Sequence, residues 1–453
     1  MGKSYSSGIR VVAYASNAWD TALGVLRIVS PFQNAGIDLV RGNFGDLAYP
    51  EYVSQGDLVL IQRDYPRYHT VYRRIIDQAH ALVKPVVFDL DDLLLELPPD
   101  HPDRLIYYYT PALLPILEAL GEVDLVTVST KALGESIQHL TSRICVLPNY
   151  LDNQIWKLHP PKPPSQTPKP VVIGYMGGPS HIPDLQYICP VLRNLLRRYT
   201  DQVQLHLYGV PPPPELADNP NVITIPSHSN IYVEFAADFQ AQDYDIAIAP
   251  LVDNRFNRCK SGVKFLEYSA LGLPGVYSRL EPYQAMVVQG ENGFLATTLD
   301  EWEATLVRLI EDPDLSYQIA LQAQATVAKD WFISQKAGQW RECYQELLQS
   351  REKERPAPIK ESSLIVSILR QVSEWQEHLE AMEHSPDRER GQKIKESEVN
   401  QRYIEKQLDE IHKSKAWKVV LFMRRLRLWL IPLGSRREKI IKQILGIWHD
   451  KFR

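Results

Sequence analysis

Short apolar runs alternate with amphipathic stretches over the first 150 residues of the chain. The runs are rich in Val, Ile and Leu on both faces, whereas the stretches between them have helical periodicity. Strands that are apolar on both faces and separated by helices are typical of a parallel sheet covered by helices on both sides. We therefore expect a doubly wound α/β domain, with elements at Ile9–Ala15, Thr21–Ala35, Leu58–Gln62, Val71–Leu82, Val86–Leu90 and Leu125–Ser129.

The same alternation returns after residues 157–170, which contain six prolines and predict an extended connector rather than a helix or central strand. The predicted fold class is therefore α/β, with two doubly wound Rossmann-like domains and a cleft between the carboxyl ends of their sheets. Residues 315–350, which include Trp331, Trp340 and Tyr344, are predicted to form helices that close the second domain. The second set of elements is predicted at Val171–Met176, Leu185–Tyr199, Gln204–Tyr208, Asn221–Ile225, a helix from Tyr232, Asp245–Ala249, Lys264–Leu271 and Gly275–Ser278.

A different pattern begins at Leu364, where apolar residues recur every three to four positions through Met382 and again from Ile404 to Ile411. Such spacing is typical of a helical arm packed on the body of the protein, and it also fits a homodimeric coiled coil through 364–411. The predicted organisation is a first α/β domain, a linker, a second α/β domain with closing helices, a helical arm and a basic amphipathic tail, at residues 1–156, 157–170, 171–350, 351–412 and 413–453.

Charge is distributed unevenly along the 453 residues. Residues 413–453 contain twelve Lys and Arg but only Glu438 and Asp450, a net charge of +10, which leaves −15 for the rest of the chain. An acidic body disfavours nucleic acid as a partner, whereas a basic tail favours an anionic surface such as a lipid leaflet. The tail also has an apolar stripe from Val419 to Leu433, with arginines off the stripe. It therefore predicts a helix lying on an anionic membrane, or alternatively one docked on its own body.

Targeting and redox signals are sparse. No signal peptide is predicted, and no uncharged apolar run reaches the roughly 18 residues that a membrane span requires. The four cysteines are too far apart for a CxxC pair or zinc-ligand spacing and fit a reducing compartment. We expect a cytoplasmic protein that associates peripherally with a membrane.

One candidate site lies at the start of the helix predicted over Lys264–Leu271. Arg258, Lys260 and Lys264 place three cations within seven residues, and Glu267 follows about one turn later. Cations at a helix N-terminus favour a diphosphate, and a nearby carboxylate accepts hydrogen bonds from ribose hydroxyls. The alternative is a solvated ladder of charges on an exposed helix.

These residues also carry a resemblance to a known family. Residues 245–278 (DIAIAPLVDNRFNRCKSGVKFLEYSALGLPGVYS) resemble the donor-nucleotide segment of retaining GT-B glycosyltransferases, the polysaccharide-building mannosyl, glucosyl and rhamnosyl transferases (glycosyl transferases group 1). Residues 173–181 (IGYMGGPSH) resemble the strand and phosphate-side loop that open the donor domain. With residues 86–98 and 125–149, the resemblance covers roughly residues 8–345.

The resemblance implies a nucleoside diphosphate sugar as co-substrate, with no other cofactor and no metal required. Arg258, Lys260 and Lys264 would be catalytic, since they would stabilise the leaving diphosphate. The implied donor-binding residues are Glu267, Ser261, Gly178, Ser180 and His181. The sequence departs from the family at Cys259, where the first of two glutamates usually stands, and the loop Gly177–His181 lacks the usual Arg or Lys.

A second candidate site is the acidic motif Val86–Leu93, which contains Asp89, Asp91 and Asp92 at a predicted strand end. Under the resemblance these carboxylates and His101 lie on the acceptor side and bind sugar hydroxyls. The motif also fits a phosphatase of the haloacid-dehalogenase type with Asp89 as nucleophile and Asp91 as acid/base. It fits the DxD metal site of GT-A glycosyltransferases, and a purely structural strand cap as well.

The expected function is transfer of a sugar, with retention, from a nucleoside diphosphate sugar to a glycan or lipid-linked glycan in surface polysaccharide synthesis. The alternative is a non-catalytic assembly protein whose degenerate GT-B body binds a glycan or nucleotide. The missing first glutamate at Cys259 favours that alternative.

Overall fold

The computed structural model describes residues 8–45, 47–141, 143–164 and 169–350, together with 368, 371, 372, 374 and 375. Its first sheet has six parallel strands in the order β2-β1-β5-β6-β7-β8. The strands are β1 (Arg10–Ala15), β2 (Asp38–Arg41), β5 (Leu58–Gln62), β6 (Val86–Leu90), β7 (Leu125–Val128) and β8 (Ile144–Val146). A short hairpin is formed by β3 (Asn43–Phe44) and β4 (Leu47–Ala48).

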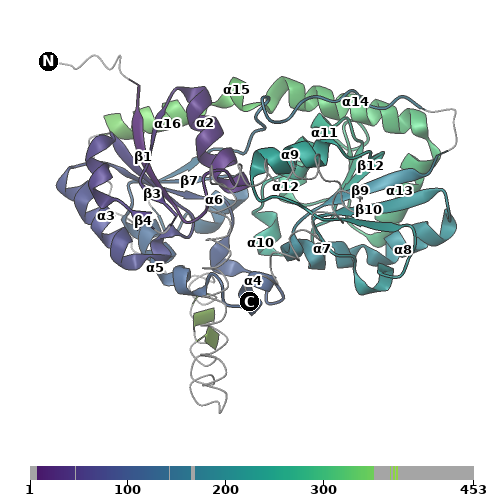
Figure 1. Cartoon of the computed structure of the whole chain (residues 1–453), viewed down its shortest axis with the longest axis horizontal. Helices are drawn as coiled ribbons and strands as arrows, with labels where there is room; N and C mark the ends of the chain where they lie inside the picture. The colour runs from purple at the N-terminus through teal and green to yellow at the C-terminus, as the bar shows by residue number, and fades with distance from the viewer. Residues whose placement is uncertain are drawn as a thin grey trace, which may run out of the picture. The chain divides into compact units, whose positions relative to one another are not determined.

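Helices cover both faces of this first sheet (Figure 1). After β1 the chain forms one helical segment, in which the π-helix η1 joins α1 and α2. The helical elements are α1 (Ala22–Gly24), η1 (Val25–Val29), α2 (Ser30–Ala35), α3 (His69–Ala81), α4 (Pro102–Leu105), α5 (Thr110–Glu122) and α6 (Lys131–Ile137), with 3-10 turns at Pro50–Gln55, Tyr65–Arg67 and Leu94–Glu96.

A second parallel sheet has the order β11-β10-β9-β12-β13-β14. Its strands are β9 (Val171–Met176), β10 (Val203–Tyr208), β11 (Val222–Ile225), β12 (Ile246–Ala249), β13 (Gly275–Ser278) and β14 (Phe294–Ala296). Its 3-10 turns are η5 (Pro179–His181) and η6 (Pro214–Leu216). The helices of this half and those that follow it are α7 (Ile182–Tyr187), α8 (Cys189–Arg198), α9 (Tyr232–Gln240), α10 (Arg255–Arg258), α11 (Val263–Ala270), α12 (Glu281–Gln284), α13 (Leu299–Glu311), α14 (Pro313–Asp330), α15 (Ile333–Lys336) and α16 (Gly338–Gln349).

The predicted fold class, two doubly wound α/β sheets, is confirmed. The central strands were predicted within one or two residues, whereas β2, β8 and β14 at the sheet edges were missed. The residues of β2 and β8 are partly or fully exposed, so they lack the continuous apolar run that marks a central strand. The helix predicted at Leu185–Tyr199 is divided into α7 and α8, and Pro190 stands in the first turn of α8.

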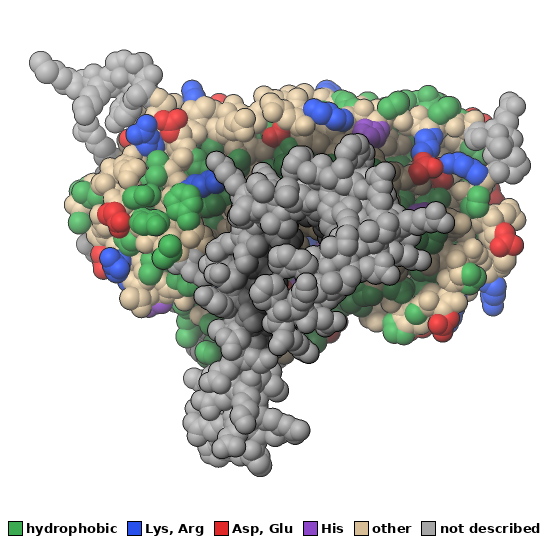
Figure 2. Space-filling view, viewed as in Figure 1, with side chains coloured by type: hydrophobic (Ala, Val, Ile, Leu, Met, Phe, Trp, Pro, Cys, Tyr) green, Lys and Arg blue, Asp and Glu red, His purple; other side chains and the backbone are tan. Residues whose placement is uncertain are grey.

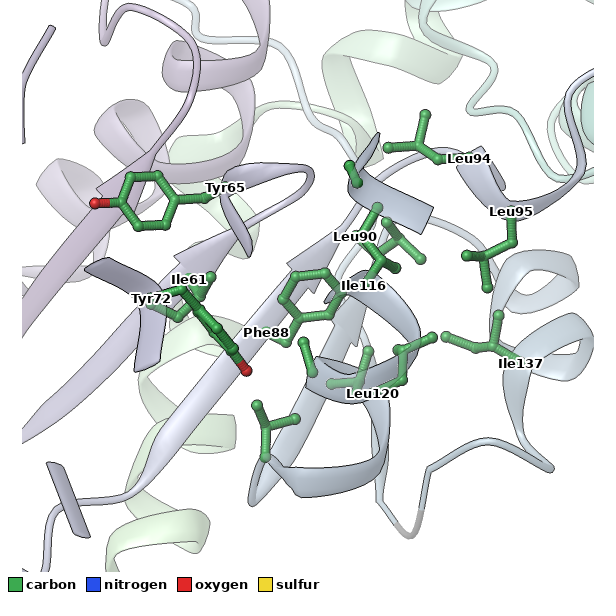
Figure 3. Packing of buried hydrophobic residues seen from close by; sticks show 14 of the residues in the cluster. Ile61, Tyr65, Tyr72, Phe88, Leu90, Leu94, Leu95, Ile116, Leu120 and Ile137 are labelled. Atoms are coloured by element: carbon green, nitrogen blue, oxygen red, sulfur yellow. The ribbon is translucent and has the colours of Figure 1, made fainter. Parts of the chain in front are cut away.

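The core of the first half lies between its sheet and α3, α5 and α6. Figure 3 shows Ile61 and Phe88 of the strands facing Ile116 and Leu120 of α5. Phe256 and Cys259, which belong to the α10 segment of the second half, are members of the same buried cluster. The α10 segment therefore packs into the core of the first half and joins the two halves.

The helices of residues 315–350 were predicted to close the second half, but not all of them pack there. Helix α14 packs against α11 and α13, but α15 and α16 pack against α2 of the first half (Figure 1). Trp340 and Tyr344 lie in a buried cluster with Val11 of β1 and Phe32 of α2. The apolar face of α16 matches this surface, so the chain returns to the first half after α14. Of the helices predicted to close the second domain, α14 packs on that half, and α15 and α16 pack on the first half.

The beginning of the predicted helical arm packs on the first half. Ile368 is buried and, with Val372, joins the core cluster around Phe88. Gln371 Nε2 donates to the Leu95 carbonyl at 3.1 Å, and Glu374 pairs with Arg104 at 3.3 Å. Ile368 and Val372, two of the apolar positions predicted for the coiled coil, thus pack against the core of their own chain. The rest of 351–412 and the tail 413–453 lie outside the described residues. Within the described part of the chain, no helix combines the length and apolarity needed to cross a membrane.

Surface charge is mixed on the described surface visible in Figure 2, where Lys, Arg, Asp and Glu side chains are interspersed. Inside the first half, by contrast, one ion pair is almost fully buried. Arg27 of η1 donates to both oxygens of Asp89 at the end of β6, with distances of 2.7 and 3.2 Å. Thr127 Oγ1 donates to the same carboxylate at 2.7 Å, and Asn149 accepts from Arg27 at 3.0 Å. The pair therefore joins η1, β6 and β7.

Breaking this pair is expected to destabilise the protein strongly. Asp89→Ala would leave the Arg27 guanidinium buried without its counter-charge, which costs about 3–5 kcal/mol of unfolding free energy. The control is Asp38→Ala, because the Arg10–Asp38 pair is exposed and such pairs contribute at most about 1 kcal/mol. Urea unfolding followed by circular dichroism measures both variants, and equal losses would contradict the role assigned to the buried pair.

Candidate functional site

The predicted site residues of the second half follow strands at which its sheet reverses its order, and those of the first half follow β6, which neighbours β5. In the second sheet β9 lies between β10 and β12, and in the first sheet β1 lies between β2 and β5. Open α/β sheets bind ligands at the carboxyl ends of such neighbouring strands. The loop Gly177–His181 follows β9, and the segment Leu251–Gly262 follows β12. Asp91 and Asp92 follow β6 in the first sheet.

Helix α11 begins at this edge without a side-chain cap. Its N-cap is Gly262, where an added Cβ would lie 2.5 Å from the Pro282 carbonyl oxygen. Any other residue would therefore force the backbone apart, so the turn into the helix requires glycine. The uncapped N–H groups and the helix dipole make this end of α11 favourable for an anion.

Lys264 stands in the first turn of α11 with a buried Nζ that has no hydrogen-bond partner among the described residues. Its ammonium lies 5.1 Å from the centroid of the Tyr175 ring, and Lys260 Nζ lies 4.8 Å from that of Phe256. Burial, together with the charge of Lys260, lowers the pKa of Lys264 to about 8. Two neighbouring cations held against aromatic rings favour an anionic ligand.

Glu267 lies one turn further along α11 and is also buried, at 3 % exposure. Its Oε1 accepts a hydrogen bond from Tyr232 Oη at 3.0 Å, and Tyr232 accepts one from Trp156 Nε1 at 2.9 Å. Burial raises the pKa of Glu267 to about 8, although Tyr232 and Lys264 oppose that shift. The alternative of a solvated charge ladder is wrong, because residues 265–270 of this helix are buried. We refer to Lys260, Lys264, Glu267 and the start of α11 as the α11 site.

Arg258 does not share this environment. Its exposed guanidinium donates to both oxygens of Asp253, at 2.6 and 2.7 Å, and to Glu281 at 2.8 Å. These hydrogen bonds raise the pKa of Arg258 above its ordinary value. Two carboxylates already compensate its charge, and the expectation that Arg258 stabilises a diphosphate stays a prediction. Ser261, in the turn between Lys260 and Gly262, makes no hydrogen bond to a described residue.

The loop after β9 is held by a carboxylate that the sequence analysis missed. Asp184, in the first turn of α7, has one oxygen 2.9 Å from His181 Nδ1. Its other oxygen accepts from the Val252 N–H at 2.8 Å and from Asn257 Nδ2 at 2.9 Å. Asp184 thus fixes the loop after β9 to the segment after β12. The spacing His-x-x-Asp at a helix start was the available signal.

Gly178 and Ser180 lie on either side of Pro179 in this loop. Gly178 is exposed, and an added Cβ would meet no atom within 4 Å. Ser180 is half-buried, and its side chain makes no hydrogen bond to a described residue. The loop therefore borders open space. The Gly177 and His181 N–H groups donate to the carbonyls of Tyr208 and Gly178, whereas the Ser180 hydroxyl is available to a ligand.

The three aspartates of the first half have different environments. Asp89 is committed to Arg27 and Thr127 and is 3 % exposed. It matches the structural alternative considered for this motif, and its predicted contact with sugar hydroxyls or role as a nucleophile is corrected. No group of three His, Cys, Asp or Glu within the described ranges is arranged to hold a metal ion.

Asp91 and Asp92 are held by Arg63, whose Nη1 lies 2.6 and 3.3 Å from their carboxylates. Arg63 has a φ of 52°, a strained backbone conformation at the end of β5. Burial raises the pKa of Asp91 to about 6. Burial opposes ionisation of Asp92 as well, but Lys260 and Arg63 lower its pKa below the ordinary value. Asp92 is thus close enough to the α11 site for the charge of Lys260 to stabilise its carboxylate.

His101 is buried and caps α4, because its Nδ1 accepts the Asp103 N–H at 3.2 Å. Its ring packs edge-on against Phe256 with 5.3 Å between centroids. Burial lowers the pKa of His101, so the ring is neutral at physiological pH. The expected role in acceptor binding is therefore replaced by a role in the contact with α10.

Cys259, at the position of the absent glutamate, is 1 % exposed. Its carbonyl accepts from Thr130 Oγ1 at 2.8 Å, and its Sγ lies 3.3 Å from Ser136 Oγ. Arg255 pairs with Glu96 of the first half at 3.0 Å beside it. The segment that contains Cys259 therefore serves as a joint between the halves.

A cavity of about 550 Å³ lies away from these residues. It opens at the amino end of the second sheet, beside the starts of β9 and β12, and its lining includes Lys162, Tyr244, Pro274 and Tyr317. None of the predicted site residues lines it.

Comparison with known proteins adds to this geometry. Residues 170–312, which contain the whole second sheet, match the family described as "Glycosyl transferases group 1". A search of curated proteins gave no match.

Solved structures share the fold. Anabaena Alr3699/HepE in complex with UDP and glucose is 16 % identical, covers 75 % of this chain and 100 % of its own, and has a TM-score of 0.52. A glycosyltransferase from Rickettsia africae ESF-5 is 12 % identical, with coverages of 76 % and 99 % and a TM-score of 0.51. The match to TarM has 12 % identity and a TM-score of 0.48, and covers 66 % of this chain and 57 % of TarM.

Helix α11 and the loop after β9 lie within the matched residues, whereas Asp89, Asp91 and Asp92 lie outside them. Residues 170–312 thus resemble glycosyl transferases group 1, the chain shares its two-sheet fold with these solved structures, and the findings support a glycosyltransferase.

Proposed function

We propose that this protein transfers a hexose or deoxyhexose from a nucleoside diphosphate sugar to a glycan or lipid-linked glycan, with retention of configuration, in surface polysaccharide synthesis. The observation that carries the proposal is the buried ammonium of Lys264 at the uncapped start of α11, which has no hydrogen-bond partner among the described residues. HepE was solved with UDP and glucose, which supports a nucleotide-sugar donor here.

Breaking the bond between sugar and diphosphate builds negative charge on the leaving phosphate. Lys264 and Lys260 stabilise that charge together with the N-terminus of α11, and they act strongly because the site is partly closed to water. No metal and no covalent nucleophile are required in this proposal. The leaving phosphate takes the proton of the attacking hydroxyl on the same face, so no separate base is assigned.

The two ends of the substrate complex are assigned to different halves. Glu267 accepts hydrogen bonds from the ribose, and Tyr232 fixes its orientation. Asp91 and Asp92, held by Arg63, accept hydrogen bonds from hydroxyls of the acceptor.

A non-catalytic glycan- or nucleotide-binding protein is the second candidate. Cys259 favours it, because this position is buried in an apolar cluster and offers no carboxylate to the donor. Thermal shift against UDP, GDP, dTDP and ADP sugars identifies the donor, since a ligand that binds only the folded state raises its stability. Release of the nucleoside diphosphate from that donor, with and without EDTA, then separates the candidates: metal-independent turnover supports the enzyme, and binding without turnover supports the alternative.

Lys264→Ala is expected to lower turnover by a factor on the order of 10², because it removes one charge that stabilises the transition state. The fold should be retained, since the ammonium that is removed makes no hydrogen bond to a described residue. Lys131→Ala is the control, because Lys131 is exposed on α6 and pairs only with Glu135. Steady-state kinetics of both variants tests the site, and parental turnover in Lys264→Ala would contradict its assignment.

Donor affinity is expected to fall as the pH rises through about 8. The free protein loses the Lys264 proton near that pH, and a diphosphate binds the charged form, so affinity decreases up to about tenfold per pH unit above it. Calorimetric titration with the identified nucleotide at pH 7, 8 and 9 measures this change.

Two variants isolate the titrating group. Glu267→Gln should keep the pH dependence. Because Glu267 itself titrates near pH 8, Lys264→Met is combined with Glu267→Gln, and this double variant should bind weakly and equally at all three pH values. Affinity that is constant or rises from pH 7 to 9 in the unsubstituted protein would exclude Lys264 as the group responsible.

The basic tail 413–453 is proposed to bind an anionic membrane and to make the protein peripheral and cytoplasmic. Each Lys or Arg near an anionic leaflet adds about 1 kcal/mol of salt-sensitive attraction, and the apolar stripe adds a salt-insensitive part. Vesicle co-sedimentation should weaken but persist as salt increases, and neutral vesicles should bind poorly. Deleting 413–453 should abolish binding while sparing transfer to a soluble acceptor; equal binding without the tail would refute the proposal.

A homodimer through 364–411 is also proposed as part of this organisation. Because Ile368 and Val372 pack in their own chain, its seam would use the later apolar positions of the arm.

A further inference from the structure

His181 lies in the loop after β9, in which the family resemblance leads one to expect an Arg or Lys. Its side chain is 18 % exposed, and its Nδ1 lies 2.9 Å from Asp184 Oδ2. Nε2 makes no hydrogen bond to a described residue and is not among the buried unpartnered atoms. One ring nitrogen is therefore committed to the protein, and the other is available to a ligand.

The partners of Asp184 determine which ring nitrogen bears the proton. Val252 N–H and Asn257 Nδ2 donate to one oxygen of Asp184, and the other oxygen faces His181. The hydrogen bond to His181 and nearby cations outweigh burial and lower the pKa of Asp184, so the carboxylate is ionised and accepts only. His181 must then donate through Nδ1–H, which leaves Nε2 of the neutral ring with a lone pair.

The surroundings keep this ring neutral. Burial, together with the charges of Lys264 and Lys260, lowers the pKa of His181 to about 3. A bound diphosphate would offset part of that effect. However, the same two lysines and the start of α11 neutralise the diphosphate, and the pKa would have to rise above 7 before the ring became charged.

We propose that His181 is a specificity-determining residue whose Nε2 accepts a hydrogen bond from a hydroxyl of the transferred sugar, and that Asp184 is the positioning residue that fixes this orientation. A phosphate diester oxygen carries no proton at neutral pH and cannot donate to Nε2, whereas a sugar hydroxyl can. The loop residue thus contacts the sugar, while Lys260 and Lys264 contact the diphosphate. This inference rests on the proposed function.

Binding measurements separate the two kinds of contact. His181→Ala should weaken the nucleoside diphosphate sugar identified among UDP-glucose, GDP-mannose, dTDP-rhamnose and ADP-glucose by about tenfold, the effect of one hydrogen bond. It should leave affinity for the parent nucleoside diphosphate within about twofold. Lys264→Ala should weaken both ligands. His80→Ala, at an exposed position on α3, should change neither.

A second measurement tests the orientation without a substitution. Nitrogen-15 NMR of the histidine side chains, with the His181 signal assigned from the His181→Ala spectrum, should show a protonated Nδ1 and an unprotonated Nε2 at pH 7, both free and with the parent nucleotide bound. A proton on Nε2 would overturn the inference.

The outcomes also distinguish this inference from the proposed function. If the unsubstituted protein binds no member of the panel, the proposed function fails, and this inference fails with it. If it binds a donor but His181→Ala weakens the parent nucleotide as much as the sugar nucleotide, or weakens neither, only the assignment of His181 is overturned.

Discussion

The arrangement of the site depends on the packing of α10 against the first half of the molecule. Phe256 and Cys259 lie in a cluster that otherwise belongs to the first sheet and its helices. Lys260 follows directly, so the same contact that joins the halves brings a cation into the electrostatic range of Asp92. A glutamate at Cys259 would place a carboxylate in an apolar cluster, where burial of an unpaired charge is costly. The departure from the family pattern at this position therefore follows from the packing.

Charge compensation distinguishes residues that bind a ligand from those that hold the fold. Arg258 has two carboxylate partners, and Arg27 and Arg63 are each bound to aspartates. Lys264, by contrast, lies next to another cation, and its buried Nζ is without a hydrogen bond to any described residue. Keeping a lysine in that state costs stability. An anion that binds there restores the balance, and this is the physical basis for assigning the diphosphate to the α11 site.

The central strands and the division into two sheets could be predicted from the sequence, because local periodicity indicates them. The residues from Lys260 to Glu267 could be singled out as a candidate site, because they form a short motif. Contacts between distant residues were not accessible in this way. Nothing local to Asp89 reveals that Arg27, 62 positions away, takes up its carboxylate. The apolar face of α16 was visible, but the surface that it covers is decided by the path of the chain after α14. Asp184 was missed because its partners, Val252 and Asn257, lie in another loop.

The most direct test of the central claim is the crystal structure of the protein with the nucleoside diphosphate sugar identified by thermal shift. The account predicts the diphosphate at the start of α11, within hydrogen-bond distance of Lys264 Nζ, with the ribose at Glu267 and the sugar toward His181. A diphosphate bound elsewhere, with the Lys264 ammonium still unpartnered, would contradict it.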